Sequence, residues 1–155
     1  MTTLDTSIDY KQLLEALADA VIFADLSGAI RFWNPGAEQL FGFTEAEALG
    51  SSLDLIVPVR FRERHWAGYN RTMATGQTRY AHDVLRVPAV HKDGRLLSIA
   101  FTVGLLYGPQ RNVTGILAVI RDETARFAED RNLRKRLAEL EQKERINITQ
   151  TATPK

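Results

Sequence analysis

Three runs with the patterns of β-strands lie in the second half of the chain, and they constrain the fold more than any other feature: the first alternates loosely, and the other two are rich in apolar and β-branched residues. They cover Arg79–Val90, Arg95–Tyr107 and Val113–Arg121. Asp93-Gly94 is a tight-turn signal between the first two runs, and a longer loop joins the last two. Because proline cannot donate to a strand ladder, Pro88 places the first run at a sheet edge or a bulge. We therefore expect three long antiparallel strands.

The first half of the chain predicts two further strands and then short helices. Two β-rich runs, residues 20–24 and 29–33, flank Asp25–Gly28, which is a hairpin signal. Asn34-Pro35 is typical of a helix start, with asparagine as the N-cap and proline at the first helical position. Thr44–Glu47 has the pattern of a capping box for a second helix. This order predicts an α+β domain with a five-stranded antiparallel sheet and helices on one face.

Both ends of the chain are polar. We expect residues 1–9 to form a flexible tail, residues 10–122 to form the folded domain, and residues 149–155 to be disordered. The domain begins with an entry helix at Tyr10–Asp19, and residues 123–148 form a charged C-terminal helix. That helix carries three leucines at coiled-coil spacing: Leu133, Leu137 and Leu140. We call these three leucines the seam. Because the seam is short, it fits either a coiled coil or a helix that faces only solvent.

Composition excludes several classes of function. The 155 residues include 20 Lys and Arg against 19 Asp and Glu, and a net charge of +1 does not favour nucleic acid or an anionic membrane. The chain has no cysteine, which removes disulfides, thiolate metal sites and thiol nucleophiles. We find no leader, no apolar run of about 20 residues and no catalytic constellation. We expect one cytoplasmic domain that is not an enzyme.

A helix between Pro58 and Gly76 directs a histidine inward. Phe61, His65 and Tyr69 are spaced four residues apart, so His65 shares a helix face with residues that belong in a core. A buried imidazole needs a hydrogen-bond partner, which can come from protein, water or a bound ligand. His65 is therefore the main candidate site residue.

Three blocks of the sequence resemble the PAS family of sensory domains over residues 10 to about 126. They are DLSGAIRFWNPGAEQLFGFTEAEALG, HKDGRLLSIAFTV and ILAVIRDETAR. The resemblance implies a PAS fold whose C-terminal helix carries the signal. PAS domains are sensing and dimerising modules of kinases, cyclases and transcription regulators. It therefore implies a homodimer, formed through the terminal helices or the sheet, and a kinase or transcription-regulator partner.

The helix around His65 is similar to that of oxygen-sensing haem PAS domains, which have Arg-x-x-His followed by an aromatic residue four positions later. Here the matching residues are Arg62, His65 and Tyr69. The resemblance implies haem b ligated through His65, with Arg71 as a partner of a haem propionate. In such domains the ligand pocket lies between this helix and the sheet. The residues that the resemblance places on the wall opposite His65 are Tyr80, Leu85, Phe101 and Val103.

Two other interpretations remain open at this stage. The first is an unknown small organic ligand or no ligand, with His65 completing the core; flavin-thiol chemistry is excluded because it requires cysteine. The second is a ligand-free PAS dimerisation or interaction module. If haem binds, Leu85 stands where oxygen sensors place a hydrogen-bonding arginine, so the site favours CO or NO over O2.

Overall fold

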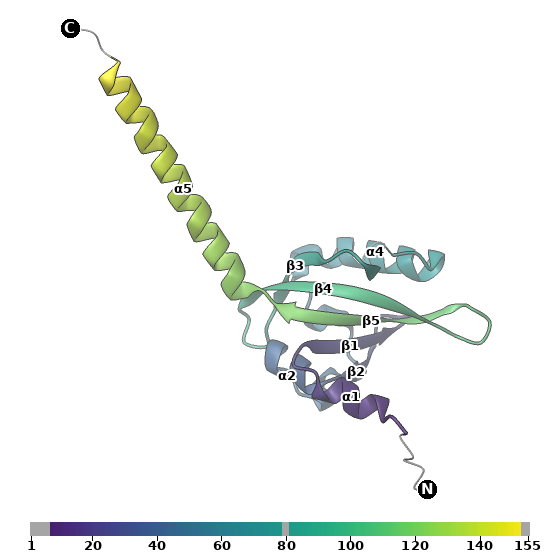
Figure 1. The fold of residues 1–155 in the computed structure, drawn as a ribbon. Helices are drawn as coiled ribbons and strands as arrows, with labels where there is room; N and C mark the ends of the chain where they lie inside the picture. Colours follow the sequence, from purple (N-terminus) through teal and green to yellow (C-terminus); the bar gives the residue numbers. More distant parts are fainter. Residues whose placement is uncertain (1–6, 79–80, 153–155) are drawn as a thin grey trace, which may run out of the picture. The chain divides into compact units, whose positions relative to one another are not determined.

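The computed structural model describes residues 7–78 and 81–152, and its centre is one antiparallel sheet (Figure 1). The strands lie in the order β2-β1-β5-β4-β3. Their bounds are Ala20–Asp25 for β1, Ile30–Trp33 for β2, Leu85–Val90 for β3, Leu96–Tyr107 for β4 and Val113–Asp122 for β5. The predicted five-stranded antiparallel α+β fold is confirmed, and Pro88 lies in the edge strand β3, as expected.

Short helices connect β2 to β3. They are α2 at Pro35–Phe41, α3 at Glu45–Ala48, 3-10 turns at Leu53–Leu55 and Val59–Phe61, and α4 at Arg62–Thr75. Both predicted caps are present. The Asn34 side chain accepts from Ala37 N, and Thr44 and Glu47 bond each other's backbone as a capping box. The helix predicted between Pro58 and Gly76 is α4 with its preceding 3-10 turn, and Gly76 ends it in the left-handed conformation at φ 65°.

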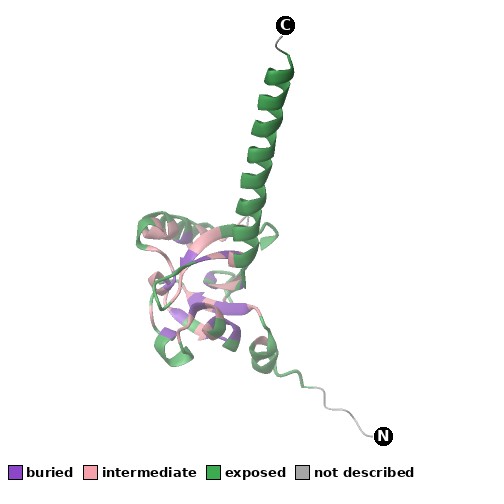
Figure 2. Cartoon of the chain, turned by 90° about the vertical axis from the view of Figure 1, so that its left-hand side faces the viewer, coloured by how far each residue is buried: buried purple, intermediate pink, exposed green. Residues whose placement is uncertain are grey.

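One hydrophobic core joins the helices to a single face of the sheet (Figure 2). The strand register places three isoleucines on this face. Ile120 pairs with Ala20 of β1 and with Phe101 of β4, and side chains two residues apart along a strand share a face. Ile22 and Ile99 therefore lie on the same face as Ile120. Helix residues from α2 and α4 pack into the same cluster. The helix α4 therefore packs against the sheet through side chains that belong to one core.

Asn34 is the one polar residue among the fully buried side chains of the described part of the chain. Its Oδ1 accepts hydrogen bonds from Val21 N (2.8 Å) and Ala37 N (2.9 Å). Its Nδ2 donates to the carbonyls of Leu14 and Asp19, both at 3.0 Å. Two acceptor and two donor bonds satisfy the amide, which offsets the free-energy cost of burying it.

The structure corrects two predicted elements. The entry helix α1 covers Tyr10–Ala16 and does not reach Asp19, because Asn34 binds the carbonyls of Leu14 and Asp19 and the chain is already extended at Leu17. The strand predicted from Arg79 begins only at Leu85, where the ladder with Phe101 of β4 starts. His82, expected in that strand, lies in an exposed turn.

The C-terminal helix α5 covers Thr124–Thr151 and belongs to a second compact unit that begins at Glu123. Residues 149–151, expected in a disordered tail, are helical. No α5 residue is buried, and the three leucines of the predicted seam are between 57% and 60% exposed. Across the described ranges, no helix is both long enough and apolar enough to cross a bilayer.

Replacing Asn34 with alanine should lower the free energy of unfolding by about 2–4 kcal/mol, because a helix cap is lost and buried backbone groups lose their partners. Urea unfolding followed by circular dichroism measures the change. Asn70→Ala, at an exposed position on α4, is the matched control and should leave stability within about 0.5 kcal/mol. Equal stability of the two variants would contradict this role for Asn34.

Candidate functional site

The inner side of α4 carries three rings that contact one another. His65 lies 4.8 Å from Trp66 and 5.9 Å from Tyr69 between ring centroids, and Trp66 lies 5.3 Å from Tyr69. The Trp66 ring stands at 75° to the imidazole, which is the edge-to-face arrangement favoured by aromatic quadrupoles. We call His65, Trp66 and Tyr69 the aromatic cluster. Of the three, Tyr69 is the most buried, at 7% exposed.

Tyr69 fastens α4 to the β1–β2 hairpin. Its hydroxyl donates a hydrogen bond to the backbone carbonyl of Asp25. Burial raises the pKa of Tyr69 to about 12, and the nearby Asp25 carboxylate acts in the same direction. The phenol is therefore neutral and remains a donor at physiological pH.

Asp25 organises the hairpin turn. Its carboxylate accepts hydrogen bonds from the hydroxyl and the backbone N–H of Ser27, from Ala29 N and from Arg31 Nε. The Ser27 hydroxyl and then Arg31 lower the pKa of Asp25 to about 2. The turn that receives Tyr69 is thus held by an ionised carboxylate.

Trp66 makes the second connection between α4 and the hairpin. Its ring covers Gly28, where φ is 81° and where a Cβ would overlap the indole. The indole N–H donates to Asp54 Oδ1 at 2.8 Å. Arg62 holds the same segment by donating to the carbonyls of Val57 and Asp54, each at 3.1 Å.

His65 is the residue of the cluster that lacks a polar partner. Among the described residues, its Nδ1 atom is shielded from solvent and has no hydrogen-bond partner. Burial lowers the pKa of His65 below its usual range, and the negative charge of Asp54 partly offsets this shift. The imidazole is therefore neutral at physiological pH. A neutral imidazole is the form that can accept a hydrogen bond or bind a metal ion.

The other predicted site residues lie in three kinds of position. Leu85, Phe101 and Val103 occupy the sheet face that also carries Ile120, because Leu85 pairs with Phe101 and Val103 follows two residues later. Phe101 packs against the core. Arg71 is exposed on α4. Tyr80 lies outside the described residues.

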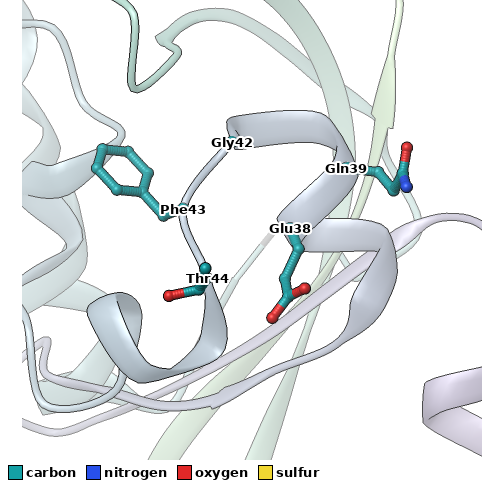
Figure 3. A pocket seen from close by; sticks show the side chains of 5 residues that line it. All are labelled: Glu38, Gln39, Gly42, Phe43 and Thr44. Atoms are coloured by element: carbon teal, nitrogen blue, oxygen red, sulfur yellow. The ribbon is translucent and has the colours of Figure 1, made fainter.

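Two surface depressions are found away from the aromatic cluster. One, of about 340 Å³, lies between the end of α2 and the start of α3, and Figure 3 shows its lining residues: Glu38, Gln39, Gly42, Phe43 and Thr44. The other, of about 310 Å³, lies where Ala18–Ala20 meets the end of β5. Within the described ranges, no three His, Asp or Glu side chains gather as a metal site.

Sequence reasoning missed the polar anchors of the site. Asp25 and Asp54 lie outside α4, and no local sequence pattern pairs them with Tyr69 and Trp66. His91 packs its ring against Gly42, where a Cβ would overlap it. Its Nδ1 accepts from Asp93 N at 3.1 Å. Gly42, which also ends α2 at φ 80°, is the sequence signal that could have indicated this close approach.

The family model described as the PAS fold matches residues 8–122. The chain belongs to the PAS family. It is 28% identical over 140 residues to the sensor protein FixL of Bradyrhizobium diazoefficiens, a match covering 90% of this chain and 26% of FixL. It is 23% identical over 137 residues to the oxygen sensor protein DosP of Escherichia coli, covering 86% of this chain and 17% of DosP. The chain thus spans only about a quarter or less of each relative.

A solved PAS domain from Colwellia psychrerythraea has the same fold, with a TM-score of 0.66 and 23% identity over 74% of this chain and 94% of that domain. The resemblance predicted from the three sequence blocks is confirmed, and the chain is a PAS sensory domain. In this PAS domain, the aromatic cluster lies on α4, the helix that faces β5 across the core.

The lowered pKa of His65 predicts a loss of stability in mild acid. The unfolded chain binds a proton at His65 near pH 6.5, whereas the folded domain resists it, so this contribution is complete above about pH 6.5 and decreases as pH falls through the folded pKa. Its slope reaches at most about 1.4 kcal/mol per pH unit. Urea unfolding between about pH 5 and 7.5 measures it.

His65→Gln should remove this slope, whereas His82→Gln, at an exposed turn position, should retain it. An NMR titration of the imidazole C2 proton gives the pKa of His65 directly. A value at or above about 6.5 would contradict the burial of this ring.

Proposed function

We propose that this PAS domain binds a small ligand between α4 and the sheet, and that His65 is the residue that contacts it. The observation that carries the proposal is the shielded, unpartnered Nδ1 of His65 in an aromatic cluster. Buried polar atoms nearly always have a partner, so an orphaned one is a position where a ligand gains a hydrogen bond. The structural change caused by ligand binding then passes from the sheet through β5 into α5, and from there to a kinase, cyclase or transcription-regulator partner.

Haem b is the first candidate ligand, because the predicted site residues offer a ligand for the iron, apolar contacts for the ring and a cation for a propionate. His65 is neutral, as an iron ligand must be, and it faces a core whose sheet side offers the apolar residues Leu85, Phe101 and Val103. Arg71 is an exposed cation on the same helix, suited to a propionate. Haem supplies a reversible binding site for a diatomic gas. The names of the relatives support this candidate, since DosP is an oxygen sensor.

The apolar residues of the sheet bear on which gas is sensed. Leu85, Phe101 and Val103 carry no hydrogen-bond donor. Bound O2 gains more from a donor than CO does, because it acquires more negative charge. These three side chains therefore favour CO or NO.

Titration of the purified protein with hemin tests the haem proposal. The wild type and His82→Ala should give a stoichiometric Soret band, and His65→Ala should lose it or bind at least about tenfold more weakly. His82 is the matched control because it is exposed in a turn. An unchanged Soret band in His65→Ala would exclude ligation by His65. Native mass spectrometry of the protein as purified then identifies any retained organic ligand.

A second candidate function is homodimerisation without a ligand, and the exposure of the terminal helices favours it. Neither α1 nor α5 has a buried residue, and Leu13, Leu133 and Leu137 are all more than half exposed. Apolar side chains at coiled-coil spacing gain free energy when a second helix covers them. A second copy of α5 provides such a surface.

Leu137→Asp should shift the protein toward monomer, because it places a charge in the seam. Sedimentation equilibrium at micromolar concentrations measures the dissociation constant, which should rise at least about tenfold. Ala138→Asp introduces the same charge one position outside the seam and should have little effect. A wild-type monomer at all concentrations would contradict the dimer.

A further inference from the structure

An ion pair joins two parts of the PAS domain that are 102 residues apart in the sequence. Arg121 Nε donates to Asp19 Oδ1 at 3.1 Å, and Arg121 Nη2 donates to Asp19 Oδ2 at 2.9 Å. Two parallel bonds fix the orientation of both groups, as bidentate arginine–carboxylate pairs do. Asp19 ends the linker between α1 and β1, and Arg121 lies three residues before the first residue of α5.

The pair continues the β1–β5 ladder beyond its last backbone contact. Ala20 pairs with Ile120 in that ladder, so Asp19 and Arg121 occupy the next opposed positions. A depression of about 310 Å³ is lined by both segments together with Gly36, Gln39 and Leu40. At its rim, the side-chain bonds between Asp19 and Arg121 add to the backbone ladder that joins the two segments.

The linker is also held from the side of α2. Asn34 Nδ2 donates to the Asp19 carbonyl at 3.0 Å, and the backbone of Gly36 lies so close that a Cβ there would overlap the carbonyls of Ala18 and Asp19. The backbone of Asp19 is therefore fixed to α2, while its carboxylate is fixed to the end of β5. A displacement of α2 or of the end of β5 is therefore passed to the other through Asp19.

We propose that the Asp19–Arg121 pair couples the α1–β1 linker to the point where β5 passes into α5, so that the entry and exit helices of the domain respond together. The Arg121 side chain is 69% exposed and that of Asp19 is 31% exposed, so the pair contributes little to global stability. The pair acts locally, because it limits the backbone motion of the α1–β1 linker and of the end of β5. The proposal rests on the proposed function only in taking α5 as the output helix.

Hydrogen exchange of the ligand-free full chain, followed by mass spectrometry, tests the coupling. Asp19→Ala should speed exchange about two- to fivefold in two places, the backbone around residues 10–20 and the first hydrogen-bonded amides of α5 at residues 127–131, while the central amides of β4 stay unchanged. Arg121→Ala should give the same pattern. The charge-exchanged double variant, Asp19→Arg with Arg121→Asp, should restore slow exchange at both ends.

Arg95→Ala is the matched control, because it breaks an exposed arginine–aspartate pair in the β3–β4 turn. It should alter neither chain end. Faster exchange around residues 10–20 without any change in α5, or a double variant no slower than the singles, would overturn the proposal. Neither result depends on His65 or on a ligand, so a failed hemin titration leaves this test intact.

Discussion

The buried amide of Asn34 is the interaction on which the arrangement of the PAS domain depends. It holds the end of α1, the start of β1 and the start of α2 at one point, through hydrogen bonds to Leu14, Asp19, Val21 and Ala37. In a low-dielectric interior an unpaired polar group is costly, so these bonds form together or the amide leaves the core. One side chain thereby sets where the N-terminal helix stops and where the sheet begins.

The same principle explains how α4 is held and why its histidine stands out. Tyr69 and Trp66 each have an apolar ring in the core and a polar tip, and each tip finds an acceptor, at Asp25 and at Asp54. His65 lies between these anchored rings and finds none. Under the proposed function, the ligand of His65 acts on a helix already fastened to the β1–β2 hairpin. Binding can shift the domain only if the ligand contacts two arrangements of helix and sheet unequally.

The strand that leads into the C-terminal helix, β5, lies between β1 and β4 in the sheet. Its central position brings it into contact with α4 on the core face, and its last residues meet the α1–β1 linker. A strand paired on both sides moves only with its neighbours. β5 is therefore suited to carry a change from the core to both flanking helices.

Local sequence determined the elements of this protein, and tertiary structure decided its contacts. Periodicity, the Asn34 and Thr44 caps and the turn glycines predicted the strands, α2, α3 and α4 because these signals act between residues close in the chain. The inward position of His65 was predicted in the same way. The early end of α1, the late start of β3, the partners of Trp66 and Tyr69, and the Asp19–Arg121 pair depend on residues far apart in sequence. No local pattern encodes such contacts, because they exist only once the sheet register has brought the segments together.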